Sequence, residues 1–391
     1  MEGYTLGQLL RRDTVLGVLN RVNAPGNLMS QFYGLTIGAD PVATIIGNGG
    51  RGQYDIFDSR RDIGVFSTPN SPPKAMRRNP IGAVPYACPR QYYSIDLNLN
   101  ELYGTRDLGS NPAGRITSKG VEYWKQQMLY ARQPMQTLVE WMAIQMFFGG
   151  FGMKPHANDP TALIPCLKTD GSATIINDTK VPASHIGNPF TVFTDKWEDP
   201  TTDIPAQFRS LNVVAARENG SPITECWING NTAVYLFSNE SMRNQNGIAN
   251  RVFNLLDPSK EIGPNQKMPD TGYSLTMGAL PEITFHVYNQ GYVPYGTALT
   301  LDAQTSESNW NLYIPDKKAI MTPPPSRDWC GMLNGSEIAQ WALDQSPIEA
   351  MGYATGFERA IEPPRIANKW LLNAGPIITQ PKAVYVCDVV T

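Results

Sequence analysis

The sequence has few of the residues that build metal sites and disulfide frameworks. It contains five cysteines and three histidines in 391 residues, with no C-x-x-C pair and no histidine at zinc-ligand spacing from another ligand. We therefore predict no metal site. An odd number of widely spaced cysteines also favours reduced, mostly buried thiols in a cytosolic setting. These residues are Cys88, Cys166, Cys226, Cys330, Cys387, His156, His185 and His286.

Charge is also scarce. Charged residues make up 17% of the chain, against about 25% in a typical soluble protein. Lys and Arg number 32 and Asp and Glu number 35, which gives a net charge of −3. That balance provides no general attraction to phosphate, so strong binding of DNA or RNA is not expected. A surface with so few charges is predicted to be partly covered, which favours an assembly.

Long hydrophobic runs are missing too. No stretch approaches the roughly 20 apolar residues that a membrane span needs, and the nearest, Trp141 to Phe148, contains Gln145. Near the N-terminus, Arg11, Arg12 and Asp13 interrupt the apolar residues before a secretion signal can form. We therefore expect a soluble protein with no membrane partner.

Catalytic motifs are equally hard to find. No G-x-S-x-G sequence occurs, and no cysteine and histidine stand in a recognisable pairing. The carboxylates of Glu198 and Asp199 precede Asp203 and Ile204 in a pattern typical of a helix N-cap. His286 lies in a predicted strand, where we interpret it as structural. We predict no catalytic residue and no enzyme.

Residues 47–52 read G-N-G-G-R-G and match the G-x-G-x-x-G pattern. Dinucleotide binding also requires a helix N-terminus directly afterwards and an acidic residue about 20 positions further on. The residues that follow are rich in turn formers and predict neither, so we expect no cofactor. Because glycine tolerates backbone angles that other residues avoid, Gly47, Gly49, Gly50 and Gly52 are interpreted as a hinge.

Residues 51–95 combine turn formers, prolines and basic side chains with only short apolar alternations. A segment this long without a core face is normally functional or disordered. We predict a projecting two-stranded arm that gains its order by docking on acidic patches of a neighbouring copy, with a solvated arm as the alternative. The predicted intersubunit contacts are Arg51, Arg60, Arg61, Lys74, Arg77, Arg78 and Arg90.

The clearest helix spans 118–148. Ser118 is a plausible N-cap, and apolar residues then recur every three or four positions until Gly149 and Gly150 end the pattern. About 30 residues give a rod of about 45 Å. Pro134 lies inside this rod and is predicted to bend it, since its ring clashes with the preceding turn and removes one backbone hydrogen bond.

Strand patterns dominate the remaining sequence. A hairpin is predicted from 162–167 and 173–176 across the Thr169-Asp170-Gly171 turn. Ser238 is predicted to cap a helix that runs through Met242 to Leu256. The other predicted strands are 232–237, 283–288, the pair 311–314 and 319–321 joined across 315–318, and the tail 383–389.

This order of elements resembles the major capsid protein E family of tailed bacteriophages, the lambda type, which is built on the Hong Kong 97-type capsid fold. The segments that carry the resemblance are spread through the chain in the expected order. They are Tyr4-Thr5, Gln8-Leu9-Leu10, Trp197, Asp199-Pro200-Thr201, Asp203-Ile204, Leu312-Tyr313-Ile314-Pro315-Asp316, Ala319-Ile320-Met321, Ala374-Gly375-Pro376-Ile377-Ile378 and Pro381.

The resemblance implies an α+β fold with six segments. They are an N-terminal arm (1–50), an extended loop (51–103), a peripheral domain (104–195) that carries the spine helix 118–148, an axial domain (196–340), a return to the peripheral domain (341–375) and a terminal strand of the axial domain (376–391). In that family the axial domains surround the centres of hexamers and pentamers, and the extended loop lies across the adjacent subunit.

The function implied is self-assembly into the icosahedral head of a phage around double-stranded DNA, with assembly in the host cytoplasm and residence in the virion. The implied partners are other copies of the chain, a portal protein, a scaffolding protein and, in some members, a decoration protein. Two alternatives stay open on the sequence. One is an encapsulin-like protein nanocompartment, and the other is a cytosolic hydrolase with a site assembled from distant residues.

Overall fold

A computed structural model gives the fold. It describes residues 29, 32–33, 43–45, 51–57, 81–97, 118–157, 162–245, 272–277, 279–294, 307–335, 348–350, 353–360 and 365–391. The chain forms two compact units. The first comprises 1–52, 86–143 and 331–376, and the second comprises 53–85, 144–330 and 377–391.

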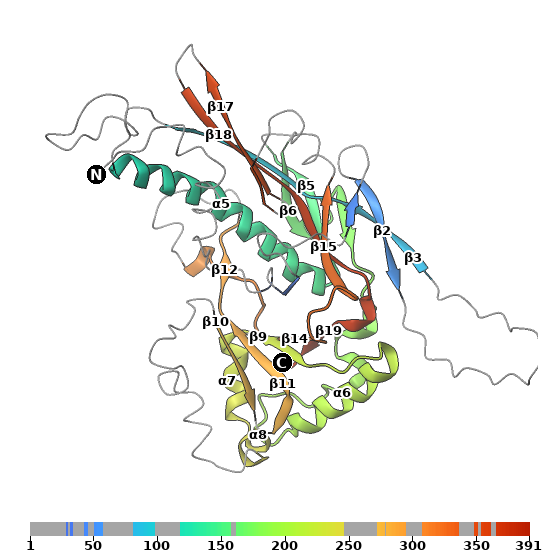
Figure 1. The fold of residues 1–391 in the computed structure, drawn as a ribbon. Coiled ribbons are helices and arrows are strands. Elements are labelled where there is room, and N and C mark those ends of the chain that lie inside the picture. Colours follow the sequence, from blue (N-terminus) through green and yellow to red (C-terminus); the bar gives the residue numbers. More distant parts are fainter. Residues whose placement is uncertain are drawn as a thin grey trace, which may run out of the picture. The chain divides into compact units, whose positions relative to one another are not determined.

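The predicted long helix is present as α5, Ser118–Phe147, and Figure 1 shows it as one continuous helix. Its apolar stripe is buried at every third or fourth position, including Trp124 and Met146. Gly149 follows it with a φ of +97°, the left-handed conformation that commonly ends helices. Ser118 is itself the first helical residue, so its predicted role as the preceding cap is wrong by one position.

The first unit is built around a six-stranded sheet. Its order is β1-β15-β18-β17-β16, and β4 pairs with β18 as well. Strand β18 is flanked by β17 and β4 along the same stretch, because Asn368 faces Phe357 on one side and Ile95 on the other. The strands are β1 (Ala43–Ile45), β4 (Arg90–Leu97), β15 (Cys330–Gly335), β16 (Ile348–Ala350), β17 (Tyr353–Ala360) and β18 (Arg365–Ile378).

The second unit contains a mixed six-stranded sheet of order β10-β11-β9-β14-β19-β8. The β11–β9 and β19–β8 pairs are parallel, and the other pairs are antiparallel. The predicted strands 283–288 and 319–321 are confirmed in this sheet, and the tail predicted at 383–389 is confirmed at Tyr385–Asp388, since Ala383 ends a 3₁₀ turn. Its members are β8 (Ile186–Gly187), β9 (Glu225–Ile228), β10 (Gly272–Met277), β11 (Leu280–Tyr288), β14 (Lys318–Thr322) and β19 (Tyr385–Asp388).

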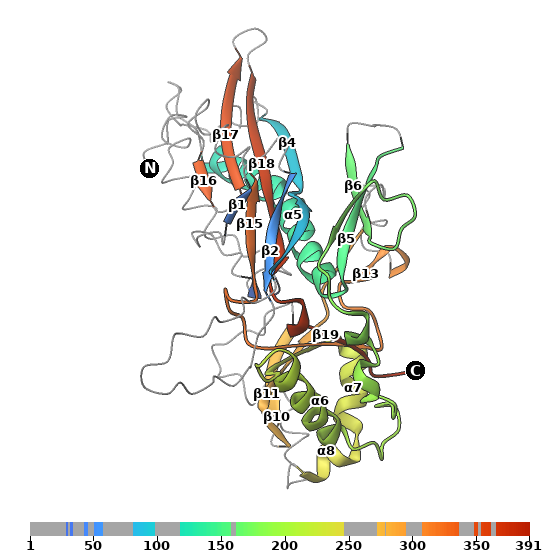
Figure 2. The ribbon, with the colours of Figure 1, turned by 90° about the vertical axis from the view of Figure 1, so that its right-hand side faces the viewer.

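Three helices pack on this sheet, and Figure 2 shows them in one layer. They are α6 (Ile204–Glu218), α7 (Gly230–Ser238) and α8 (Glu240–Gln245). One hydrophobic core joins them to the strands and extends along the chain from Phe193 to Val390. The predicted capping role of the acidic residues before α6 is confirmed, because Asp203 Oδ1 accepts a hydrogen bond from the backbone N–H of Ala206 at 3.1 Å.

The predicted strand at 232–237 is wrong, because these residues belong to α7. Asn229 caps that helix by accepting from the backbone N–H of Thr232 at 2.8 Å. The apolar run is buried at Ala233, Leu236 and Phe237, a spacing that suits one face of a helix. The next helix, α8, begins at Glu240 after the capping Asn239, so Ser238 is not its cap.

The hairpin predicted at 162–176 is also wrong in its pairing. Strands β6 (Leu163–Leu167) and β7 (Ile175–Asp178) exist, but both pair with β5 (Gly150–Pro155), which lies between them. Strand β5 leaves helix α5 directly, and its backbone supplies the hydrogen-bonding groups that both neighbours need.

The late hairpin predicted across 315–318 does not form either. Strand β13 (Asn311–Leu312) pairs with β12 (Gly291–Tyr292), whereas β14 pairs with β9 and β19. The chain turns away at Lys317, which has a φ of 70° and donates its backbone N–H to Thr232 Oγ1 at 3.0 Å. The remaining short elements are the 3₁₀ turns η2 (Ala183–His185), η3 (Pro189–Thr191), η4 (Glu307–Asn309) and η5 (Pro381–Ala383).

The junction between α5 and β5 provides a test of the fold. Gly150 has a φ of +118°, and a Cβ there would lie 1.9 Å from the carbonyl oxygen of Asn177. We expect Gly150→Ala to lower the free energy of unfolding by at least about 1–3 kcal/mol, because the backbone strain alone is of that size. Urea denaturation measures the loss.

Gly171→Ala is the matched control. A Cβ at Gly171 would meet nothing within 4 Å, so this substitution should change the stability by less than about 0.5 kcal/mol. Equal stability of the two variants would contradict the described course of the chain at Gly150.

Candidate intersubunit surfaces

The predicted two-stranded arm is present where it begins and ends, in two paired strands that we call its root. Strands β2 (Arg51–Phe57) and β3 (Ile81–Ala87) form a separate two-stranded sheet. The two strands approach closely, because a Cβ on Gly82 would lie 3.0 Å from Ile56 Cγ1. Residues 58–80, which carry most of the predicted basic contacts, lie outside the described residues.

The root of the arm has a core face, which corrects the prediction that 51–95 lacks one. Tyr54, Val84 and Tyr86 are all buried, whereas Phe57 remains 46% exposed. Val84 and Tyr86 are two positions apart in β3 and therefore share one face of that strand. The alternation of Val84 and Tyr86 was the sequence signal for this face, and the surrounding prolines and glycines obscured it.

Both strands of the root are held by the end of strand β18 and the residues after it. Tyr86 Oη donates a hydrogen bond to the carbonyl oxygen of Pro376 at 3.1 Å. The tyrosine reaches this carbonyl because Gly375 has no side chain, and a Cβ there would lie only 2.0 Å from Tyr86 Oη. On the other strand, the backbone N–H of Phe57 donates to the carbonyl oxygen of Thr379 at 2.8 Å.

Two of the seven predicted basic contacts lie in described segments. Arg51 begins β2 and Arg90 begins β4, and both are exposed. The guanidinium of Arg90 lies 5.7 Å from the centre of the Tyr92 ring, within the range of a cation–π contact. The structure places these two arginines on different sheets and does not bring them together. Outside the described residues lie Arg60, Arg61, Lys74, Arg77 and Arg78.

Of the four predicted hinge glycines, Gly52 is the one that lies in a described segment, and the hinge stays a prediction. Gly52 lies within strand β2, so it is part of a paired segment, and the boundary between the two compact units falls directly after it. Gly47, Gly49 and Gly50 lie outside the described residues. The last two residues of this motif begin strand β2, Arg51–Phe57.

Pro134 is exposed inside α5, and the helix continues on both sides of it. Proline has no N–H, so the carbonyl oxygen four residues before Pro134 loses its partner within the helix. Because Pro134 is exposed, water can bond that oxygen instead. The predicted bend at this position stays a prediction.

The fold was compared with known proteins. No protein-family model matches the sequence, and no curated protein matches it. Among solved structures, the protein assigned as the capsid protein of a prophage in Escherichia coli CFT073 is similar over 100% of both chains, with 13% identity and a TM-score of 0.54. This chain has the fold of a phage capsid protein.

Two further structures are similar at lower scores. A phage-related protein from Bordetella bronchiseptica RB50 has 11% identity and a TM-score of 0.46 over 99% of this chain and 98% of the other. The capsid of Ralstonia phage GP4 has 12% identity and a TM-score of 0.43 over 90% and 86%. The likeness to the prophage capsid protein confirms the predicted α+β capsid fold as a fold, and its segment boundaries stay predictions.

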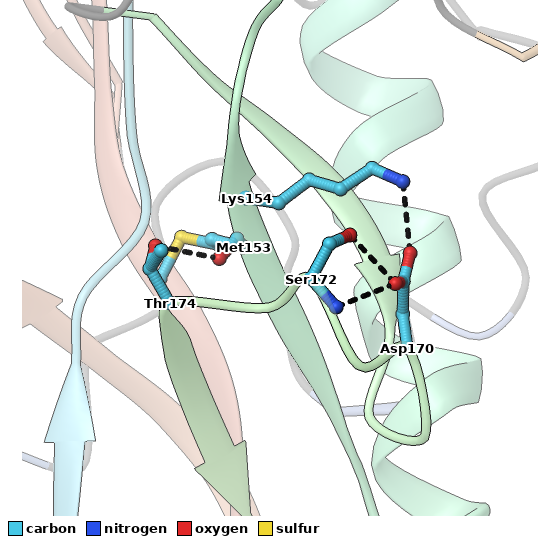
Figure 3. A network of polar contacts seen from close by, with 5 residues as sticks. All are labelled: Met153, Lys154, Asp170, Ser172 and Thr174. Carbon is cyan, nitrogen blue, oxygen red and sulfur yellow. Dashed lines mark hydrogen bonds and ion pairs between the residues drawn. The ribbon is translucent and has the colours of Figure 1, made fainter.

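The polar network in Figure 3 shows how this capsid fold uses a paired lysine and aspartate. Asp170 accepts from Lys154 Nζ at 2.8 Å and from the backbone N–H and hydroxyl of Ser172 at 2.9 and 2.6 Å. The Lys154 bond, followed by the Ser172 bonds, lowers the pKa of Asp170 well below its usual value. The carboxylate therefore stays charged and fixes the turn between β6 and β7.

A buried carboxylate in α5 was missed by the sequence reasoning. Glu140 is fully buried, and its Oε1 accepts from the backbone N–H of Met29 at 2.8 Å. Met29 begins a helical turn, since its carbonyl accepts from the N–H of Tyr33 at 3.2 Å. A buried carboxylate needs such a partner, so Glu140 ties this N-terminal turn to the helix. The signal was a single acidic residue within the apolar run 138–148.

The cysteines show no sign of nucleophilic chemistry. All five are buried and free. Burial raises the pKa of the Cys226 and Cys387 thiols and raises that of Cys330 to about 12. Because the thiolate is the reactive form, these three side chains are packed as apolar groups. His286 is likewise paired, with its Nε2 lying 2.5 Å from Glu225 Oε2.

Metal and membrane sites were also sought in the described part of the chain. Within it, no group of three or more His, Cys, Asp or Glu side chains is placed to hold a metal ion. Among the helices that the structure describes, none has the length and apolar character needed to cross a membrane.

The close packing of Tyr86 against Gly375 predicts the effect of adding one methyl group to Gly375. Gly375→Ala should displace Tyr86 and loosen the root of the arm, because no room exists for the added carbon. Tyr86→Phe should cost only about 0.5–1.5 kcal/mol, the usual value of one hydrogen bond. Chemical denaturation and limited proteolysis at the arm measure both. Faster cleavage in Tyr86→Phe than in Gly375→Ala would contradict this account.

Thiol chemistry gives a second test. Because all five cysteines are buried, the native protein should react with a thiol reagent such as Ellman's reagent at least about a hundredfold more slowly than the denatured protein. After denaturation all five should react. A thiol that titrates rapidly at neutral pH in the native protein would contradict the described burial.

Proposed function

We propose that this protein is the major capsid protein of a tailed phage, of the lambda type, and that it assembles into the hexamers and pentamers of an icosahedral head. The observation that carries the proposal is the likeness in fold to a prophage capsid protein over the whole of both chains. The low charge of the sequence supports it. Exposed large apolar side chains, among them Tyr130 at 63% and Val213 at 71%, also suit surfaces that become covered.

The six predicted segments receive the corresponding roles in this proposal. The core that extends from Phe193 to Val390 supports an axial domain formed by 196–340 together with 376–391. The β2–β3 root supports an extended loop within 51–103 that reaches a neighbouring subunit. Helix α5 serves as the spine of the peripheral domain, 104–195 with 341–375.

Packaged double-stranded DNA is the proposed content of the shell, held without strong specific contacts. A net charge of −3 suits a wall that does not grip the DNA while it is packed. A portal, a scaffolding protein and a decoration protein are the other proposed partners. Assembly in the host cytoplasm and residence in the virion follow from the same proposal.

Particle formation tests the assembly function. We expect the purified protein to elute in the void volume of a size-exclusion column and to appear as closed shells by negative-stain electron microscopy. Many weak contacts repeated over a shell give such a stable particle. A discrete small oligomer under all assembly conditions would overturn the proposal and favour the hydrolase alternative.

The contents of native particles separate a phage head from a nanocompartment. Particles purified from cells that produce them should protect double-stranded DNA from nuclease. A protein cargo in place of DNA would favour the encapsulin-like alternative instead.

The arm gives a further prediction. Arg77→Glu with Arg78→Glu should abolish particles while the circular dichroism spectrum of the subunit stays unchanged, because the arm contributes to contacts between copies. The charge-conserving Arg77→Lys with Arg78→Lys serves as the control and should still assemble. Unchanged particles in the charge-reversed variant would remove the arm from the assembly contacts.

A further inference from the structure

The outer face of α6 carries a stripe of two cations around an apolar residue. Arg209, Val213 and Arg217 recur every four positions and are all exposed, Val213 by 71%. The two arginines stand about 12 Å apart at 1.5 Å per residue. Glu218 lies 3.5 Å from Arg217, but the Arg217 side chain remains 67% exposed. We call these three residues the α6 stripe.

The outer face of α7 has the opposite character. Its exposed apolar residues are Val234 at 63% and Tyr235 at 38%, and the helix itself contains no charged residue. Asp316 lies at its N-terminal end, where Oδ1 accepts from Asn231 Nδ2 at 3.1 Å. Glu240 follows its C-terminal end and is exposed. We call Val234, Tyr235, Asp316 and Glu240 the α7 stripe.

The two stripes match in length as well as in sign. Nine residues of α7 span about 13 Å, so its two flanking carboxylates are spaced much like the two arginines of the α6 stripe. Lys317, which follows Asp316 in the chain, donates its Nζ to the carbonyl oxygen of Thr391. Each stripe therefore presents two like charges with an apolar centre between them.

The stripes lie toward opposite edges of one sheet. Helix α6 contacts η5, the turn that leads into β19, and the Arg217 guanidinium lies 6.0 Å from the centre of the Phe190 ring. Helix α7 contacts β11, and its first N–H donates to Asn289 Oδ1 at 2.6 Å. In the sheet order, β19 and β11 are each second from an edge, at opposite ends. The contacts of α6 and α7 with the sheet therefore lie toward different ends of it, and Glu240 opens α8, which contacts both helices.

We propose that the α6 stripe of one subunit docks on the α7 stripe of the next copy, in the ring contact of the capsomer. A contact between two different patches of the same chain is heterologous, and such contacts form rings when the rotation between copies closes. Opposite charges at both ends fix the register and reject the reversed pairing of like patches. The inference rests on the proposed assembly function and names the surfaces that carry it.

Charge reversal tests the contact. Arg209→Glu with Arg217→Glu, and separately Asp316→Arg with Glu240→Arg, should each raise the critical concentration for assembly at least about tenfold, because the penalty repeats in every ring contact. The quadruple variant has all four signs inverted and should return to within about threefold of the unmodified protein. Light scattering and electron microscopy measure assembly.

Two controls keep the test decisive. Arg327→Glu reverses an exposed arginine that belongs to neither stripe and should assemble normally. Asp316 also accepts from Asn229 Nδ2, the cap of α7, so circular dichroism is recorded for each variant. If Asp316→Arg unfolds the subunit, Glu240→Arg alone replaces that pair, and the triple variant with both arginine reversals should recover partly.

The outcomes separate this inference from the proposed function. Normal assembly of the double variants, or a quadruple variant no better than they are, would overturn the stripe contact while particles of the unmodified protein uphold the capsid function. An Arg327→Glu defect as large as theirs would also count against the stripes. Failure of the unmodified protein to form particles would instead remove the capsid function itself.

Discussion

The placement of the arm depends on Gly375, because this residue has no side chain to exclude Tyr86. Tyr86 occupies the space that any larger residue would fill, and its hydroxyl bonds the next carbonyl, that of Pro376. A few residues later Thr379 holds the other strand of the arm through Phe57. These contacts fix the root of the arm to its own subunit, and the proposed contact with a neighbouring copy starts from that root.

The contacts of the root reduce the conformational entropy that the arm has to lose on assembly. A segment with no contact to its own subunit would lose all its conformational freedom on assembly, and the entropy cost would weaken every contact. Burial of Tyr54, Val84 and Tyr86 orders the root before assembly. In the proposed assembly, the contact of the arm with another copy starts from this ordered root.

The exposed surface of the second unit offers contacts that are individually weak. Val213, for example, is exposed between Arg209 and Arg217. Exposed ion pairs contribute little individually, typically less than about 1 kcal/mol. Contacts of this strength can break and reform while a shell is growing, and their number in a closed shell makes the whole stable.

The sequence by itself determined the elements whose signals are local. The apolar spacing and the terminal glycines fixed α5, Asp203 marked the start of α6, and the alternation at 383–389 marked the final strand. Only the tertiary structure decided which strands pair and which apolar runs become helices. Strands β6 and β7 part around β5, and the run at 232–237 is helical because Ala233, Leu236 and Phe237 pack into the core of the second unit. Pairing and burial depend on residues far away in the chain, such as Gly375 beneath Tyr86, and no local pattern carries that information.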